Sequence, residues 1–247
     1  MSILTINPSP ILTISVISRK DKPVIDHRDY DRLASILNYA ADDEETKVVV
    51  LRGLDGCFCR GGDINEFIDG INKARLISAV TALFRALANF PKPIVACVEG
   101  DAIGVGCTIL FHCDVVVAAP ASRFRVPFVD YGLVPDAATS ILAPRRMGYF
   151  AAFRFFCLGE ELGAEQAERL GVVSSIATEN DCHSAALDIA HRLARKPNDA
   201  LQQTRKLLRG DTGDLCERID EEIDLFRRAL ECASTQKRLR RLSRMAG

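Results

Sequence analysis

The hydrophobic positions of the chain follow two different spacings. Residues 11–18 (ILTISVIS) alternate apolar and polar side chains, which predicts a β-strand. Residues 47–53 (KVVVLRG), 93–98 (PIVACV) and 114–119 (DVVVAA) are short apolar runs rich in β-branched side chains. Such runs are typical of strands that are buried on both faces. The first half of the chain is therefore expected to contribute a series of buried strands.

Apolar side chains between these strands recur at helical spacing. Residues 33–40 and 76–87 each place their leucines on one helical face, and Pro91 should end the second helix. Residues 104–113 are also expected to be helical. The alternation of strands and helices predicts an α/β architecture with parallel strand pairing.

The pattern changes near residue 195. The segments ALQQTRKLLRG and DLCERIDEEIDLFRRALECA are amphipathic and lack any strand pattern. We therefore predict an α/β core over residues 1–195 and a helical region over residues 196–247. The last stretch, KRLRRLSR, is strongly basic. A solvated helix end is the favoured interpretation, and contact with ligand phosphates is the alternative.

Composition excludes several classes of function. The 247 residues carry a net charge of −1, which gives no reason to expect a nucleic-acid or anionic-membrane partner. Four histidines and no CxxC pair make a metal site improbable, and nine scattered cysteines suit a reduced, cytoplasmic protein. The N-terminus lacks a signal-peptide pattern, and the final residues are not the SKL peroxisomal signal. We expect a cytoplasmic enzyme without a resident cofactor.

Two glycine turns are the first candidates for chemistry. Residues 58–67 (FCRGGDINEF) and 99–107 (EGDAIGVGC) each lead from a strand through glycines into a helix. Such turns expose backbone N–H groups that can hold a negative oxygen, and two of them could form an oxyanion hole. Most glycine turns are only tight turns, so each alone is weak evidence. A dinucleotide fingerprint is disfavoured because Ile109 stands where Gly or Ala is needed.

Asp136 is the second candidate. It lies in the sequence GLVPDAATS (residues 132–140) among mostly apolar neighbours. One interpretation is a helix N-cap, which would lower the pKa of the carboxyl. The other is a general base in a dry pocket, where desolvation would raise that pKa.

These segments together resemble the crotonase (enoyl-CoA hydratase/isomerase) superfamily. FCRGGDINEF is similar to its first signature, and residues 92–124 (KPIVACVEGDAIGVGCTILFHCDVVVAAPASRF) to its second. Residues 126–140 and 158–176 resemble its next two blocks. The resemblance implies a spiral of ββα units followed by a helical trimerisation region, and a homotrimer or a dimer of trimers. It implies acyl-CoA thioester substrates, with the N–H groups of Gly62 and Val105 holding the thioester oxygen.

The sequence departs from the hydratases of this family at two positions. Thr108 and Phe128 stand where those enzymes carry catalytic glutamates. The pattern is closest to the enoyl-CoA isomerases, which keep one carboxylate in the turn occupied here by Asp136. The resemblance therefore implies a shift of a β,γ double bond to α,β, with Asp136 as acid and base. A bulky or cyclic acyl group is a conjecture based on the short arm of aspartate.

The resemblance also assigns residues to binding. Thr108, Phe128 and Leu133 are expected to line the substrate pocket. Arg60, Asp63 and Ile64 are expected to contact coenzyme A, and Arg19 and Lys20 are further candidates for its phosphates. His112 is interpreted first as a core or helix-face residue.

Three alternatives stay open. A hydrolytic aryl-CoA dehalogenase is suggested by the stretch DAATS, although the chain has no tryptophan to position water. An enoyl-CoA hydratase is disfavoured by the two missing glutamates. A non-catalytic acyl-CoA-binding scaffold would bind the ester without changing it.

Overall fold

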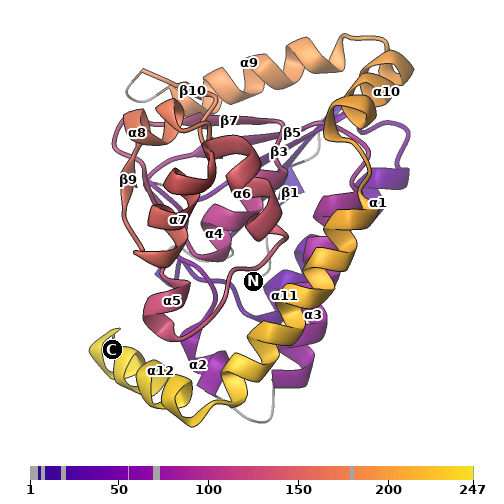
Figure 1. Ribbon diagram of the computed structural model, residues 1–247. Helices are drawn as coiled ribbons and strands as arrows, with labels where there is room; N and C mark the ends of the chain where they lie inside the picture. The colour runs from indigo at the N-terminus through magenta and orange to yellow at the C-terminus, as the bar shows by residue number, and fades with distance from the viewer. Residues whose placement is uncertain are drawn as a thin grey trace.

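Two β-sheets of unequal size form the centre of the molecule (Figure 1). The computed structural model describes residues 5–6, 9–17, 21–54, 56–68, 73–178 and 181–246. The larger sheet has the strand order β1-β2-β3-β5-β7-β10. Its strands are β1 (Thr5–Ile6), β2 (Ile11–Ser15), β3 (Val48–Arg52), β5 (Ile94–Val98), β7 (Val115–Ala118) and β10 (Ser175–Ile176). All neighbours in it pair in parallel except β1 and β2.

The smaller sheet has the order β4-β6-β8-β9. Its strands are β4 (Cys57–Cys59), β6 (Asp101–Ile103), β8 (Arg123–Arg125) and β9 (Leu162–Gly163). Each of β3, β5 and β7 continues after a short turn into the next strand of this sheet, β4, β6 or β8. This repeated passage from the large sheet to the small one, with a helix before the next repeat, is the predicted ββα spiral. The α/β architecture with parallel pairing is therefore confirmed.

Helices cover both faces of the larger sheet and extend beyond it (Figure 1). The helices of the first part are α1 (His27–Asp42), α2 (Ile64–Ile68), α3 (Lys73–Asn89), α4 (Val105–Thr108), the 3-10 turn η1 (Ile109–His112) and α5 (Phe128–Tyr131). Those that follow are α6 (Thr139–Met147), α7 (Tyr149–Cys157), α8 (Ala164–Arg169), α9 (Cys182–Ala194), α10 (Asn198–Arg209), α11 (Gly213–Glu231) and α12 (Ala233–Ala246). The helix expected over residues 104–113 is present as α4 and η1 in succession.

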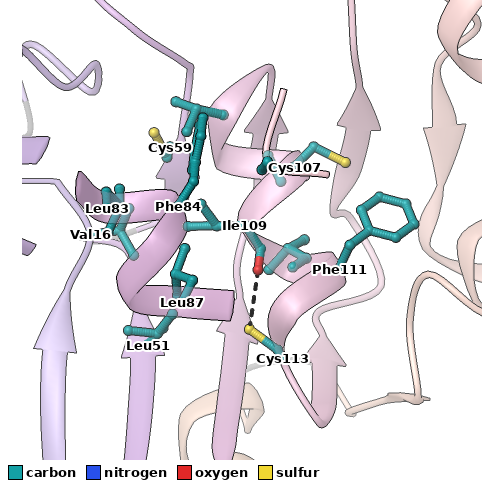
Figure 2. Close-up of a cluster of buried hydrophobic side chains, with 14 of the residues drawn as sticks. Val16, Leu51, Cys59, Leu83, Phe84, Leu87, Cys107, Ile109, Phe111 and Cys113 are labelled. Carbon is teal, nitrogen blue, oxygen red and sulfur yellow. Dashed lines mark hydrogen bonds between the residues drawn. The ribbon is translucent and has the colours of Figure 1, made fainter. Parts of the chain in front are cut away.

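Strand β3 shows how the core divides. Val49 and Leu51 point into the main core with α1 and α3, whereas Val48 and Val50 pack against α9 on the opposite face. Figure 2 shows part of the main core, where Leu51 of β3 lies near Leu87 of α3. Because both faces are covered, the polar side chains of β2 are buried as well, with Thr13 only 7% exposed. The alternation in residues 11–18 therefore does not mark a solvent-facing side of that strand.

The C-terminal helices pack onto the core. Helix α11 lies beside α3 along one side of the molecule, and α12 crosses below it next to α2 (Figure 1). Arg85 of α3 and Asp220 of α11 form an ion pair of 2.6 Å across this contact. The division of the chain at residue 195 stays a prediction.

Candidate active site

The two glycine turns lie side by side because the strands before them are paired. β4 and β6 run parallel, with Cys59 opposite Ala102, so both turns leave the same edge of the small sheet. A Cβ built on Gly104 would lie 3.7 Å from the Cα of Gly61. Gly104 has φ 54° and ψ −124°, a conformation that side-chain-bearing residues avoid. Its backbone turn starts helix α4 directly beside the first turn.

The amide of Gly62 is left free by the local strand pairing. Ile25 N donates to Gly61 O, and Asp63 N donates to Ile25 O. These two bonds flank Gly62, whose own N–H takes no part in the bridge. Val105 is the first residue of α4, where backbone N–H groups have no intrahelical partner. Among the described residues, neither N–H donates a hydrogen bond to the protein.

Both amides belong to residues that line one cavity, and Asp136 lines it too. The cavity lies between the glycine turns, α5 and the C-terminal helix α11. Its described lining is mostly apolar and consists of Tyr30, Arg60, Gly61, Gly62, Ile64, Phe67, Val80, Ile103, Gly104, Val105, Pro127, Phe128, Tyr131, Leu133, Asp136, Ile223 and Phe226. Asp136 is the one carboxylate among these residues. The arrangement places a single acid and two free backbone donors around the same apolar space.

Asp136 is buried, with 5% of its surface exposed. Its Oδ1 accepts a hydrogen bond of 2.7 Å from the hydroxyl of Thr108. The pKa of Asp136 is raised from 3.8 to about 7: burial is the largest cause, the hydrogen bond from Thr108 opposes it, and the nearby negative charge of Glu222 adds to it. A carboxyl group with a pKa near neutrality can take up and release a proton at physiological pH.

Asp136 does not cap helix α6 through its side chain. The N-cap position is Ala138, which has no side-chain acceptor. Glu222 of α11 supplies one instead, accepting from Ala138 N at 2.6 Å and from Ser140 N at 3.0 Å. The carboxylate of Asp136 is thereby left to Thr108 and the cavity. Of the two interpretations of the sequence, the N-cap is not the one observed.

The turn after Asp136 is strained and is held by two side chains from other elements. Ala137 and Ala138 both have left-handed conformations, with φ of 58° and 56°, which is unusual for residues with a Cβ. His112 Nε2 donates to Ala137 O at 2.8 Å, because a carbonyl can only accept. Burial lowers the pKa of His112 to about 3, so the ring is neutral. His112 and Glu222 together fix the turn that orients Asp136.

The residues expected in the substrate pocket lie in two places. Phe128 and Leu133 line the cavity. Thr108 is fully buried and is not among the lining residues, because it lies behind Asp136 and contacts the carboxylate. Its position is therefore that of a residue that holds Asp136.

The residues expected to contact coenzyme A also differ in position. Arg60 and Ile64 line the cavity, and the exposed Arg60 side chain forms an ion pair of 2.8 Å with Asp101. Asp63 is buried, pairs with Lys22 and accepts a hydrogen bond from Asn65 N at the start of α2. Its carboxylate is occupied by these contacts. Arg19 and Lys20 lie outside the described residues.

Four residues of the site did not emerge from the sequence pattern. Tyr30 comes from α1, and Glu222, Ile223 and Phe226 come from α11. Glu222 lies on the buried stripe of α11, between Ile219 and Phe226. An acidic residue on an apolar stripe is a signal that could have identified it. Tyr30 carried no comparable signal.

Comparison with known proteins places the chain in a family. A sequence model described as enoyl-CoA hydratase/isomerase matches residues 8–242. The 2,3-dehydroadipyl-CoA hydratase of Escherichia coli (strain K12) is 34% identical over 178 residues, covering 72% of this chain and 70% of that protein. The 1,2-epoxyphenylacetyl-CoA isomerase of the same organism is 30% identical over 205 residues, covering 80% and 78%.

Solved structures agree with this assignment. The enoyl-CoA hydratase/isomerase from Pseudoalteromonas atlantica T6c has a TM-score of 0.91 at 28% identity, covering 99% of this chain and 98% of that one. The chain therefore belongs to the enoyl-CoA hydratase/isomerase family and is an enzyme of that family, which acts on acyl-CoA thioesters. The relatives include both hydratases and isomerases. The particular reaction must be argued from the site.

Two searches of the described part of the chain bear on other functions. Over these residues, no helix is long and apolar enough to cross a membrane. The same residues contain no group of three or more His, Cys, Asp or Glu side chains arranged to hold a metal ion. All nine cysteines are free.

Proposed function

We propose that this protein is an enoyl-CoA isomerase that shifts a β,γ double bond to the α,β position, with Asp136 as the single acid and base. The observation that carries the proposal is that Asp136 is the one carboxylate among the described cavity-lining residues. An isomerisation needs only one proton carrier, because the proton removed from the α-carbon is returned to the γ-carbon of the same molecule. Hydration uses a base to activate water and an acid to protonate carbon.

The first step is the removal of an α-proton by the carboxylate of Asp136. The electron pair of the broken C–H bond forms a double bond between the α-carbon and the thioester carbon. The thioester oxygen becomes negative, and the N–H groups of Gly62 and Val105 donate hydrogen bonds to it. Thr108 engages Oδ1 of Asp136, which leaves Oδ2 as the oxygen that accepts the proton.

The second step reverses the proton transfer at a different carbon. The protonated Asp136 gives its proton to the γ-carbon, the electrons of the dienolate move back, and the α,β double bond remains. The pKa of about 7 supports both steps, since the group can serve first as a base and then as an acid. The apolar lining supports the same reaction, because it keeps water away from the intermediate.

The binding of coenzyme A is also part of the proposal. Arg60 is exposed at the cavity and is the candidate for contact with the phosphates or the pantetheine arm. Ile64, beside it on α2, provides an apolar contact. Asp63 acts indirectly by holding Lys22 and the start of α2. No separate cofactor is proposed, since coenzyme A belongs to the substrate.

The test is a panel of β,γ-unsaturated acyl-CoA esters assayed with the wild type and with Asp136→Asn. We expect formation of α,β-enoyl-CoA by the wild type and a loss of about a hundredfold or more in kcat for the variant. In deuterated water the wild type should also exchange substrate α-protons. A variant that keeps full activity on every ester would remove Asp136 from the mechanism.

The same panel separates the other activities. An α,β-unsaturated ester that gains water would establish a hydratase, and a halogenated aryl-CoA that releases halide would establish a dehalogenase. Binding of esters without change in any of them would establish a scaffold. Each of these results would overturn the proposed isomerisation.

A further inference from the structure

The hydroxyl of Tyr30 is a polar group of the cavity that the proposed mechanism does not use. Tyr30 lies in the first turn of α1, shortly after Ile25, whose backbone bridges to Gly62. Its side chain lines the cavity, and the residue is only 2% exposed. A Cβ built on Gly62 would lie 3.2 Å from the Tyr30 hydroxyl oxygen. The hydroxyl is therefore next to the turn that carries one of the two free amides.

Among the described residues, no hydrogen bond joins the Tyr30 hydroxyl to the protein, and its oxygen is not one of the fully enclosed atoms that lack a partner, so it faces the open space of the cavity. The surrounding wall offers few candidates, since Phe67, Val80, Phe128, Leu133 and Phe226 are all apolar. An acyl chain that fills this space would shut water out, and a hydroxyl then left without a partner would be unfavourable, whereas a phenylalanine would carry no such penalty. A polar atom of the bound ligand is the natural partner for this group.

The Tyr30 hydroxyl is a donor throughout the neutral range. Burial, followed by the charge of Asp136, raises its pKa well above the ordinary value. It therefore keeps its proton near Asp136 and is suited to donate to a neutral oxygen. The thioester oxygen already has two donors in Gly62 and Val105, so a different ligand oxygen is the better match.

We propose that Tyr30 selects acyl-CoA esters whose acyl chain carries a hydroxyl or carbonyl oxygen near the reacting carbons. The substrate class would then be oxygenated enoyl-CoA esters rather than plain hydrocarbon chains. This inference rests on the proposed function only in that the cavity receives the acyl group. A site that donates a hydrogen bond to a ligand oxygen discriminates against the analogue lacking it, because its own buried donor is then left unpaired.

The experiment measures binding of saturated esters, which cannot isomerise. The probes are hexanoyl-CoA and its 3-, 4- and 5-hydroxy and 4- and 5-oxo derivatives, titrated calorimetrically into the wild type, Tyr30→Phe and Tyr39→Phe. Tyr39 is the matched control, because it lies on the same helix and is 67% exposed. We expect at least one oxygenated probe to bind the wild type about tenfold more tightly than hexanoyl-CoA does. Tyr30→Phe should lose this preference and bind hexanoyl-CoA within about twofold of the wild type.

Two results would overturn the inference. One is a wild type that binds no oxygenated probe more tightly than hexanoyl-CoA. The other is a Tyr30→Phe variant that loses affinity equally for all probes, which would assign the hydroxyl to a group that all esters share. If selective binding holds while the isomerisation assay fails, only the proposed function is overturned.

Discussion

Thr108 Oγ1 donates a 2.7 Å hydrogen bond to Oδ1 of Asp136. Thr108 occupies the position where the resemblance to hydratases would place a catalytic glutamate, and here it serves the neighbouring acid instead. The bond stabilises the charged carboxylate and opposes the effect of burial, which together give Asp136 a pKa of about 7. Thr108 therefore lowers the pKa of Asp136 from the position where the hydratases would carry a second carboxylate.

Thr108→Val removes this hydrogen bond while keeping the shape of the side chain. The charged form of Asp136 loses a donor, so its pKa should rise above the wild-type value. The rising limb of the pH profile of kcat/KM should move to higher pH, and the rate at pH 7 should fall severalfold. Thr108→Ser keeps the hydroxyl and should retain the wild-type profile. Identical profiles for the valine and serine variants would contradict this role.

The raised pKa of Asp136 also predicts how stability depends on pH. The folded protein keeps the proton up to about pH 7, whereas the unfolded chain releases it near 3.8. Between these values the unfolded state binds fewer protons, so the contribution of Asp136 to stability is full below about pH 4 and falls as pH rises to about 7. Relative to Asp136→Asn, which does not titrate, the wild type should lose roughly 2–4 kcal/mol of unfolding free energy over this interval.

Urea unfolding of both proteins at several pH values measures this difference. The gap between wild type and variant should change between pH 4 and 7 and stay constant above about pH 8. A gap that is the same at every pH would mean that Asp136 titrates near its ordinary value.

Glu222→Gln tests the contact between α11 and the strained turn. The carboxylate accepts from two amides, Ala138 N and Ser140 N, and a glutamine offers only one acceptor oxygen in its place. The unfolding free energy should fall by about 1–3 kcal/mol. The loss of the negative charge should also lower the pKa of Asp136, so the rising limb of the pH–rate profile should move to lower pH.

Glu221→Gln is the matched control for this variant. Glu221 neighbours Glu222 on α11 but is exposed and paired with Arg218. Its substitution should leave the pH–rate profile unchanged. The unfolding free energy should stay within about 0.5 kcal/mol of the wild type. If the two variants behave alike, Glu222 has no special role in the site.

Gly106→Ala tests the close packing of the two glycine turns. A Cβ at this position would lie 2.4 Å from Cys59 O, so β4 and α4 would have to separate. We expect a loss of at least about 1–3 kcal/mol in unfolding free energy and a marked fall in kcat, because the Gly62 and Val105 amides would no longer face one oxygen. Gly163→Ala is the control, since nothing lies within 4 Å of its added Cβ, and it should change stability by less than about 0.5 kcal/mol. A Gly106→Ala protein with wild-type stability would contradict this packing.

Most of the fold could be predicted from local patterns. The β-branched runs at residues 47–53 and 93–98 are strands, and the apolar spacing over residues 76–87 is a helix that ends before Pro91. Periodicity reveals these elements because each depends on side chains a few positions apart. The burial of Thr13 on β2 was not predictable in this way, since α9 covers that part of the sheet from far along the chain.

The candidate site also has some features that depend on local sequence and others that depend on contacts between distant segments. By itself the sequence determined the two glycine turns and the lone acid Asp136, because backbone freedom at glycine and the identity of a side chain are local properties. Only the tertiary structure decided that Glu222, 84 residues from Ala138, caps the turn beside Asp136, and that Tyr30 borders the same cavity. The pKa of Asp136 belongs to this second class, since burial and neighbouring charges come from elements that meet only in the folded chain.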